Sequence, residues 1–317
     1  MSQRRIARIL MSAAATVALG AVPALAQNYP ERTIELVVPS TPGASADILG
    51  RALADEMSKH LGQPVIVVNK PSGIVGTGFV SRAKPDGYTL LHAAAVSVTV
   101  APLTDSKIGY THKSFDPICH TFKNDQVIVA RNNTYKTVKD ILEATKKKEG
   151  GLSVGIPGIA TIPHLAVVEL GQLTKTEFNG VPFRGPAESI QMMIGGHVDF
   201  TVAPLTAAAK SGLEMPGLFA DKRNPAMPDV PTVAEQGYDV SPLSFGLMAA
   251  PAGLPADIKK KLDEACRIAA NSEQYKKLAR NRMQPTDYYG DSAAAAKLVE
   301  LDVAQKRRLL TSLGMVK

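Results

Sequence analysis

Short apolar strands alternate with amphipathic helices from residue 34 to about residue 219, and this alternation restricts the fold more than any other feature of the chain. A strand, a helix and a second strand pack as one unit, and repeats of that unit build parallel sheets covered by helices. The pattern therefore predicts an α/β protein. Strands are expected at 34–38, 65–68, 88–92, 126–130, 153–156, 176–182, 199–202 and 245–250, and helices at 46–61, 137–148, 164–173, 186–194, 255–270 and 292–313.

The loop from Ser40 to Ser45 joins the first strand to the first helix. Ser45 is expected to cap this helix, and Asp47 places a carboxylate in its first turn, at the positive end of the helix dipole. A small-residue loop ahead of a helix exposes backbone N–H groups, which bind anions without lysine or arginine. Because loops after parallel strands meet at one edge of a sheet, they predict reversible anion binding in a cleft. Small and hydroxyl residues fill these loops: Ser40, Thr41, Gly43, Ser72, Gly73, Ser97, Thr99, Gly158 and Thr161.

The first 26 residues have the organisation of a signal peptide. Arg4, Arg5 and Arg8 precede an apolar stretch at 9–21, and Ala24-Leu25-Ala26 is a small-residue cleavage site. The stretch is too short for a membrane anchor, so the protein is expected in the periplasm, by the general secretory or the twin-arginine route. Three of the 36 Lys and Arg residues lie here, which leaves 33 against 29 acidic residues, a net charge of +4. So small a charge argues against nucleic-acid binding.

Cys119 and Cys266 are the only cysteines of the chain. Two thiols can pair in an oxidising periplasm. Their spacing, however, is not that of a disulfide framework, and Cys266 falls on the apolar face of an expected helix. Two buried free thiols are therefore the favoured interpretation, because buried cysteine behaves as a small hydrophobe. The sequence alone leaves the pairing open.

Catalytic and metal-binding motifs are incomplete. Gly43-Ala44-Ser45-Ala46-Asp47 approaches the nucleophile elbow G-x-S-x-G, but Asp47 replaces its last glycine, and His164 is the one plausible base. The P-loop and dinucleotide fingerprints are absent, and the six histidines lack metal-ligand spacing. The chain is interpreted as a binding protein without metal or cofactor. A serine hydrolase using Ser45 is the remote alternative.

Short stretches over nearly the whole mature chain occur, in the same order, in one known family. They are Tyr29-Pro30, Val37-Val38-Pro39 with Pro42-Gly43 and Asp47, Leu61-Gly62-Gln63-Pro64-Val65, Asn69 with Pro71 and Gly73, Pro85-Asp86-Gly87-Tyr88-Thr89-Leu90, Asp116-Pro117-Ile118, Pro182-Phe183-Arg184-Gly185, Gly195-Gly196-His197-Val198-Asp199, Pro228-Asp229-Val230-Pro231-Thr232-Val233-Ala234-Glu235 and Ala250-Pro251-Ala252-Gly253. On these stretches the chain resembles the periplasmic solute receptors of the tripartite tricarboxylate transporter type, also called the Bug family. Each stretch alone is weak evidence for the family, whereas the complete set in this order is highly specific for it.

The resemblance implies a two-lobed type II periplasmic-binding-protein fold, in which each lobe is a central sheet flanked by helices and the ligand cleft lies between the lobes. We expect lobe 1 to comprise 27–125 and 241–317, and lobe 2 to comprise 126–240. The resemblance also implies binding of a small organic carboxylate and its delivery to a membrane permease of one large and one small subunit. We expect a monomer. A periplasmic sensor feeding a membrane kinase would use the same cleft and stays an alternative.

The resemblance further implies which loops contact the ligand. Arg184 is expected either to pair with a distal ligand carboxylate or to form a salt bridge within its lobe. His164 follows Pro163 at a helix start and is expected either to cap that helix or to touch the ligand. The contacts carried over by position are Ser40, Thr41, Gly43, Ala44, Ser45, Ile74, Val75 and Ser97 in the first lobe, and Gly158, Thr161 and Arg184 in the second.

Four departures from the family pattern make the expected cleft more apolar. Without an aspartate after the strand at 199–202, it lacks a partner for an ammonium group, and citrate would leave buried polar groups unsatisfied. The predicted ligand is therefore an aromatic or aliphatic mono- or dicarboxylate, whose body gains from apolar burial. The departures are Ala44 for a glycine, Ile74-Val75 for Ala-Gly, the loop Ile156-Pro157-Gly158-Ile159, and Ala203-Pro204 for the aspartate.

Overall fold

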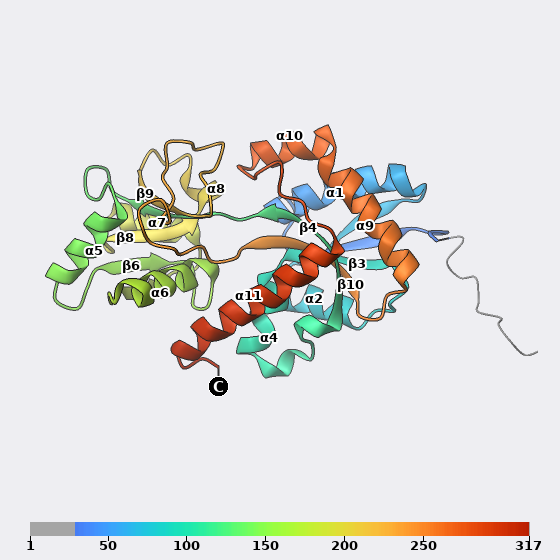
Figure 1. Ribbon diagram of the computed structural model, residues 1–317, viewed down its shortest axis with the longest axis horizontal. Helices are drawn as coiled ribbons and strands as arrows, with labels where there is room; N and C mark the ends of the chain where they lie inside the picture. The colour runs from blue at the N-terminus through green and yellow to red at the C-terminus, as the bar shows by residue number, and fades with distance from the viewer. Residues whose placement is uncertain (1–28, 317) are drawn as a thin grey trace, which may run out of the picture.

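Two five-stranded sheets covered by helices form the molecule (Figure 1). This computed structural model describes residues 29–316, so the expected signal peptide lies outside the described residues. The first sheet has the order β2-β1-β3-β10-β4 and the second β7-β6-β8-β5-β9. The strands are β1 Ile34–Val38, β2 Val65–Asn69, β3 Thr89–Ala94, β4 Phe115–Lys123, β5 Gln126–Ala130, β6 Ser153–Ile156, β7 Asn179–Pro182, β8 Phe200–Pro204, β9 Glu214–Phe219 and β10 Phe245–Pro251.

The sheets are mixed. Strand β1 pairs parallel with β2 and β3, and β6 with β7 and β8, whereas β10 is antiparallel to β3 and β4, and β5 to β8 and β9. The α/β expectation is confirmed. The helices are α1 Ser45–Leu61, α2 Gly73–Ser81, α3 Val96–Thr99, α4 Ala101–Thr104, α5 Val138–Lys147, α6 Ile162–Thr174, α7 Pro186–Ile194, α8 Leu205–Ala208, α9 Ala256–Asn271, α10 Glu273–Asn281 and α11 Ser292–Ser312. None of these helices is long and apolar enough to span a membrane.

Both faces of each sheet are buried, because successive strand residues point to opposite sides. In β1, Leu36 packs into the core under α1 and α9, while Val37 packs into a second core with residues of α2 and α11. In β5, Ile128 packs into one core of the second sheet, and its neighbour Val127 packs into the core on the opposite face. This two-sided burial explains the nearly continuous apolar runs of the strands.

The two lobes, each a sheet with its helices, are connected three times. The chain passes from lobe 1 to lobe 2 between β4 and β5 and returns between β9 and β10. Helix α11 makes the third connection, since it packs on β4 of lobe 1 and reaches α6 of lobe 2 (Figure 1). At that end Arg308 Nη2 lies 2.7 Å from Glu169 Oε1.

The sequence pattern predicts part of this architecture correctly. The strands expected at 34–38, 126–130 and 153–156 and the helix at 186–194 have the same bounds in the structure. Strands β4 and β9 and helix α10 are missed, and α2 begins at Gly73, inside a segment expected to be a loop. Strands β4 and β9 contain Pro117 and Pro216, which argue against a strand. Both are edge strands, where a missing N–H is tolerated.

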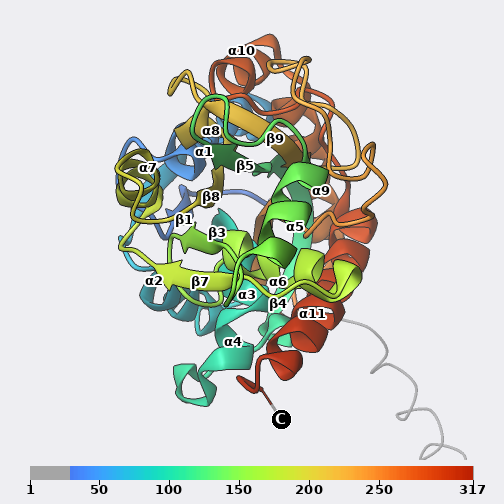
Figure 2. The ribbon, with the colours of Figure 1, turned by 90° about the vertical axis from the view of Figure 1, so that its left-hand side faces the viewer.

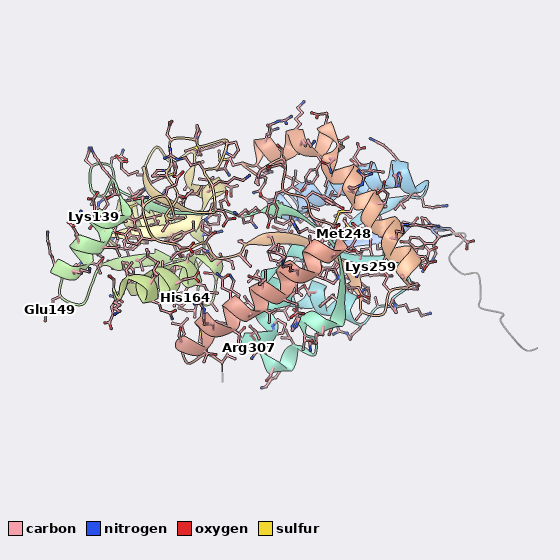
Figure 3. All side chains as sticks on the ribbon, viewed as in Figure 1. Lys139, Glu149, His164, Met248, Lys259 and Arg307 are labelled. Carbon is pink, nitrogen blue, oxygen red and sulfur yellow. A yellow bond between two sulfur atoms is a disulfide. The ribbon has the colours of Figure 1, made fainter. Side chains whose placement is uncertain are left out.

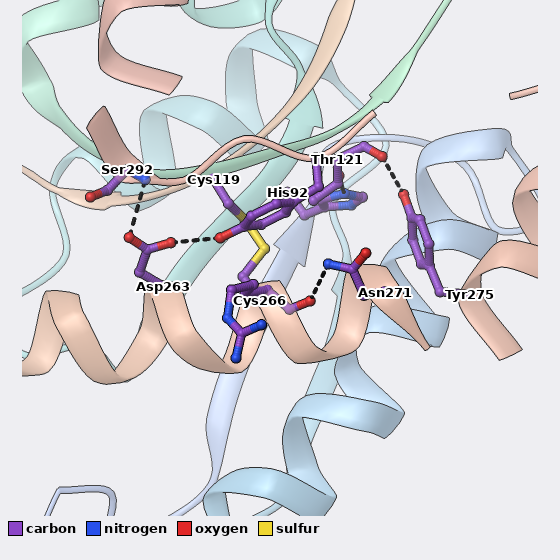
Figure 4. Close-up of a disulfide and its surroundings, with 10 residues drawn as sticks. His92, Cys119, Thr121, Asp263, Cys266, Asn271, Tyr275 and Ser292 are labelled. Atoms are coloured by element: carbon purple, nitrogen blue, oxygen red, sulfur yellow. Dashed lines mark hydrogen bonds between the residues drawn. A yellow bond between two sulfur atoms is a disulfide. The ribbon is translucent and has the colours of Figure 1, made fainter. Parts of the chain in front are cut away.

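The expectation of two free thiols is wrong. Cys119 of β4 and Cys266 of α9 form a disulfide, with their Cα atoms 6.6 Å apart (Figure 4). Cys266 does lie on the apolar face of α9, as expected, but this face packs against β4, a strand that the sequence pattern misses. The two cysteines are 147 positions apart. Their contact therefore depends on tertiary packing that spacing does not reveal.

Removing this disulfide tests its contribution to stability. Closing so long a loop restricts the unfolded chain, so we expect Cys119→Ala/Cys266→Ala to lower the free energy of unfolding by about 2–5 kcal/mol. Urea denaturation without reductant, followed by circular dichroism, measures the change. Dithiothreitol is expected to destabilise the wild type and leave the double variant unchanged; equal stability of the two oxidised proteins would contradict the expectation.

Candidate ligand-binding cleft

A cleft of about 410 Å³ lies between the lobes. No lysine, arginine or histidine occurs among the described residues that line it. The cleft instead combines apolar side chains with a few hydroxyl and amide groups, as is usual for small-molecule sites. Lobe 1 contributes Ser45, residues 94–96 and Phe245; lobe 2 contributes Pro157, residues 161–163, Pro186, Pro204 and Thr206; the crossing segments contribute Asn124, Gln126, Leu243 and Ser244, and α11 contributes Asp302.

Three helices begin at this cleft: α1 from lobe 1, and α6 and α7 from lobe 2, the lobe that faces the viewer in Figure 2. Each start has the same hydrogen bond, from a loop N–H to the side chain four residues later. The bonds are Gly43 to Asp47 Oδ2 at 2.8 Å, Ala160 to His164 Nδ1 at 3.1 Å, and Arg184 to Glu188 Oε2 at 2.7 Å.

These bonds leave the first helical amides unused. In α1 the described residues provide no acceptor for the N–H groups of Ser45 and Ala46, and the first intrahelical bond comes from Ile48. In α6 the N–H of Ile162 is likewise without an acceptor in the described chain. Unsatisfied first-turn amides carry the positive end of the helix dipole and bind anions. Ser45 and Ile162 both line the cleft, so each lobe contributes a residue with an unused helix-start amide to it.

Ser45 is not the helix cap, contrary to expectation. The N-cap is Ala44, which makes no side-chain bond, and Asp47 secures the loop instead. Asp47 is buried and also accepts hydrogen bonds from Arg51 and Asn69, at 2.9 and 2.8 Å. Burial opposes ionisation of Asp47, but these three hydrogen-bond donors outweigh it and hold the pKa of the carboxyl below its ordinary value. The hydroxyl of Ser45 is left at the cleft.

Of the expected ligand contacts in the first lobe, only Ser45 lines the cleft. The loop around Gly43 and Ala44 precedes it, and Gly43 has a φ of 84°, a conformation that favours glycine. Ile74 and Val75 form the exposed first turn of α2, which Ser72 caps. The remaining three lie away from the lining: Ser40 with a buried hydroxyl, Thr41 exposed, and Ser97 bonded to Thr77 and Ala94.

In the second lobe, Thr161 lines the cleft, and its hydroxyl donates to the carbonyl of Gly158 at 2.8 Å. Gly158 itself has a φ of 116° and shapes the turn. Arg184 is exposed, forms no ion pair with any described residue and lies outside the lining, so the expected salt bridge within the lobe is not found. His164 lies on α6 (Figure 3), and its Nδ1 atom accepts the N–H of Ala160 in the preceding loop; α6 has no side-chain cap, so the expected capping of the helix is not found, and contact with the ligand stays a prediction.

Sequence reasoning misses the residues that form the back of the cleft. Asn124, Gln126, Leu243 and Ser244 belong to the two segments that cross between the lobes, and Asp302 belongs to α11. One signal was present: Gln126 is the single polar residue of an otherwise apolar strand. The prolines at 157, 163, 186 and 204 also mark the cleft, each at the end of a strand or the start of a helix.

The arrangement does not support catalysis. The described part of the lining contains no histidine to serve Ser45 as a base, its one carboxylate, Asp302, is paired with Lys306, and the Nδ1 atom of His164 is already occupied by the Ala160 amide. Among the described residues, no cluster of histidine, cysteine and acidic side chains has the geometry to hold a metal. Amides, hydroxyls and apolar walls bind a solute without reacting with it.

Known proteins resemble this chain both in sequence and in fold. The family model described as "Tripartite tricarboxylate transporter family receptor" matches residues 49–315. The UPF0065 protein in the gbd 5' region of Cupriavidus necator is 35% identical to this chain over 328 residues, which cover 96% of each protein. A TctC solute-binding protein from Polaromonas, solved without ligand, is 29% identical with a TM-score of 0.77, and the match covers 90% of this chain and all of that one.

Two more distant structures share the fold. MatC from Rhodopseudomonas palustris, with bound malate, is 24% identical with a TM-score of 0.71, and the match covers 89% of this chain and 100% of that one. An R. palustris protein with adipate is 23% identical with a TM-score of 0.75, and the match covers 91% and 99%. These likenesses concern the two-lobed fold alone.

The acceptor role of His164 predicts a pH dependence. Burial lowers its pKa, and burial likewise lowers the pKa of His92 to about 4. The folded protein therefore binds fewer protons than the unfolded chain below the ordinary histidine pKa of about 6.5. Their contribution to stability is complete above that pH and is lost as the pH falls toward the lower, folded-state values.

We expect the free energy of unfolding, measured with urea, to fall between pH 7.5 and pH 5. His164→Gln retains an acceptor but does not titrate, so the fall is expected to be smaller by up to about 1.4 kcal/mol per pH unit. His60→Gln, on an exposed side chain, is the control and is expected to behave as the wild type. The same pH slope in His164→Gln and the wild type would contradict the prediction.

Proposed function

The chain belongs to the tripartite tricarboxylate transporter receptor family, whose members are periplasmic solute receptors and not enzymes, and on this premise we propose that its cleft binds a small carboxylate with an apolar body. The observation that carries the proposal is the combination of unused helix amides with a lining free of basic side chains. Amides at helix starts hold one carboxylate group. They do not supply the several cationic partners that a tricarboxylate would need.

The walls of the cleft favour an apolar ligand body. Residues 94–96, Ile162 and Phe245, together with the four prolines, surround the space between the amide-bearing helices. Burying apolar surface there contributes roughly 25 cal/mol per Å², whereas each buried polar group without a partner costs about 1–3 kcal/mol. An aromatic or aliphatic mono- or dicarboxylate meets both conditions. Malate and adipate in the two distant structures are small dicarboxylates of the same chemical class.

The receptor is proposed to work in the periplasm as a monomer that delivers its ligand to a membrane permease of one large and one small subunit. Its lobes are assigned to 27–125 with 241–317 and to 126–240, and residues 1–26 to a signal peptide. The matching family model and the curated relatives support this assignment of role. No observation at the cleft favours a sensor over a transport receptor.

A panel of acids tests the ligand class. Benzoate, hexanoate and adipate are expected to raise the melting temperature, while citrate and aspartate leave it unchanged. At a ligand concentration 100 times Kd, binding stabilises the folded state by about 2.7 kcal/mol. Thermal unfolding identifies the binders, and titration calorimetry gives their affinity. Stabilisation by citrate or aspartate, but not by the apolar-bodied acids, would overturn the proposal.

A matched pair of variants tests whether the α1 amide holds the carboxylate. Ser45 is the first residue of the helix, where proline is tolerated, and Ala44 already has the extended conformation (φ −64°, ψ 159°) required before proline. Ser45→Pro removes the N–H and the hydroxyl, and Ser45→Ala only the hydroxyl. We expect about tenfold weaker binding of the best acid by Ser45→Pro and a change within about twofold by Ser45→Ala.

Calorimetry on both variants, after circular dichroism has verified their fold, decides the point. Equal losses in the two variants would assign the contact to the hydroxyl instead. Full affinity in Ser45→Pro would show that the carboxylate binds elsewhere.

A further inference from the structure

Two buried oxygen atoms at the cleft accept no well-oriented hydrogen bond from the described residues: Gln126 Oε1 and Asp302 Oδ1. Both residues line the cleft, and their exposed fractions are 3% and 1%. Most buried polar atoms of folded proteins are paired with protein or water. Asp302 Oδ1 still has the Lys306 ammonium nitrogen 3.2 Å away, whereas Gln126 Oε1 has no partner at all in the part of the chain that the structure describes, so Gln126 Oε1 indicates a place where a bound molecule supplies a donor.

The orientation of Gln126 is determined by its other amide atom. Nε2 donates to the carbonyl oxygen of Asn124 at 2.8 Å, and a carbonyl cannot donate in return. The NH₂ group must therefore face Asn124, which leaves Oε1 as the free acceptor. Gln126 is also the first residue of β5, where the chain enters lobe 2, so its position is set by the pairing of β5 with β8 and β9.

Asp302 is held in a buried network on α11. Its Oδ2 accepts the hydroxyl proton of Thr99 at 2.6 Å. Lys306 Nζ lies 3.2 Å from Oδ1 and pairs with it as a buried ion pair, and the ammonium group also donates to the Leu243 carbonyl and to Gln305. Oδ1 is thus an acceptor in an ion pair that carries no net charge.

The cleft therefore combines two kinds of polar group. The amide end is made by the starts of α1 and α6, which offer donors, and the acceptor end by Gln126 and Asp302, which offer oxygen atoms. We propose that the receptor selects carboxylates that carry a hydroxyl group on the apolar body, with this hydroxyl donating to Gln126 Oε1. The inference rests on the proposed function, because it presumes that the amide end holds a carboxylate. Asp302 Oδ1 is the second acceptor available to the same group.

A neutral donor fits this end better than an ammonium group. Lys306 already neutralises Asp302, so a second cation would be repelled by its ammonium group at close range. Desolvating an ammonium group is also costly unless a charged partner is free. A hydroxyl needs one acceptor and brings no charge.

Two pairs of acids test the inference in the wild-type protein: benzoate with 4-hydroxybenzoate, and hexanoate with 6-hydroxyhexanoate. One neutral hydrogen bond corresponds to about fivefold in affinity, so in at least one pair the hydroxylated acid is expected to bind about fivefold tighter by titration calorimetry. 4-(Aminomethyl)benzoate is the cationic comparison and is expected to bind more weakly than 4-hydroxybenzoate.

A variant then assigns the contact to Gln126. Gln126→Met keeps the length of the side chain and removes the acceptor, so the ratio of the two affinities, measured within this variant, is expected to fall from about five to about one. Thr206→Val is the matched control, because Thr206 lines the same cleft but is exposed. It is expected to keep the preference.

The outcomes separate the two proposals. If neither parent acid nor its hydroxylated partner binds in either pair, the proposed function fails and the inference with it. If the parent acids bind and the hydroxyl adds nothing, or the ammonium compound binds tightest, the inference alone is overturned. A preference that persists in Gln126→Met would also overturn it. The ligand series in the wild type decides the question even where Gln126→Met does not fold.

Discussion

The structure of the cleft depends on how the backbone amides at three helix starts are satisfied. Helices leave their first N–H groups without internal partners. Here the side chains of Asp47, His164 and Glu188 take the loop amide rather than a first-turn amide. The loops are held in place, and the amides that follow stay available. Each of these side chains thus fixes the loop ahead of its helix without using the first-turn amides that suit the lobes to anions.

This arrangement also explains the scarcity of charge in the cleft. Paired cations would hold a carboxylate more strongly, but they would attract any anion and be costly to bury. In the proposed mode of binding, amide donors instead bind the carboxylate group of the ligand, and the apolar walls select the ligand body by its shape and by the apolar surface it buries. The charged pair that does approach the cleft, Asp302 with Lys306, is internally neutral.

The sequence predicts what depends on local pattern. Strand β1, its loop and the apolar face of α1 follow from periodicity and turn chemistry, and so does the presence of Ser45 and Thr161 at strand-end loops. What it misses depends on position in the sheet or on distant contacts. Strand β4 contains a proline, which a strand tolerates only at the edge of a sheet. Because the sequence pattern does not predict β4, it predicts neither the disulfide between Cys119 of β4 and Cys266 nor the crossing segment that leads from β4 to Gln126. The sequence pattern predicts Asp302 only as an acidic residue of a helix, because it does not show that α11 contacts both lobes.

The disulfide between Cys119 and Cys266 has a topological consequence. Lobe 2 lies entirely between these two residues in the chain, so the cross-link closes a covalent ring that contains the whole lobe. A protease that cuts a surface loop of lobe 2 produces two polypeptides that the disulfide still joins, and each of them contains part of lobe 1. The lobe that forms one wall of the cleft is thereby tethered at both ends to the lobe that forms the other.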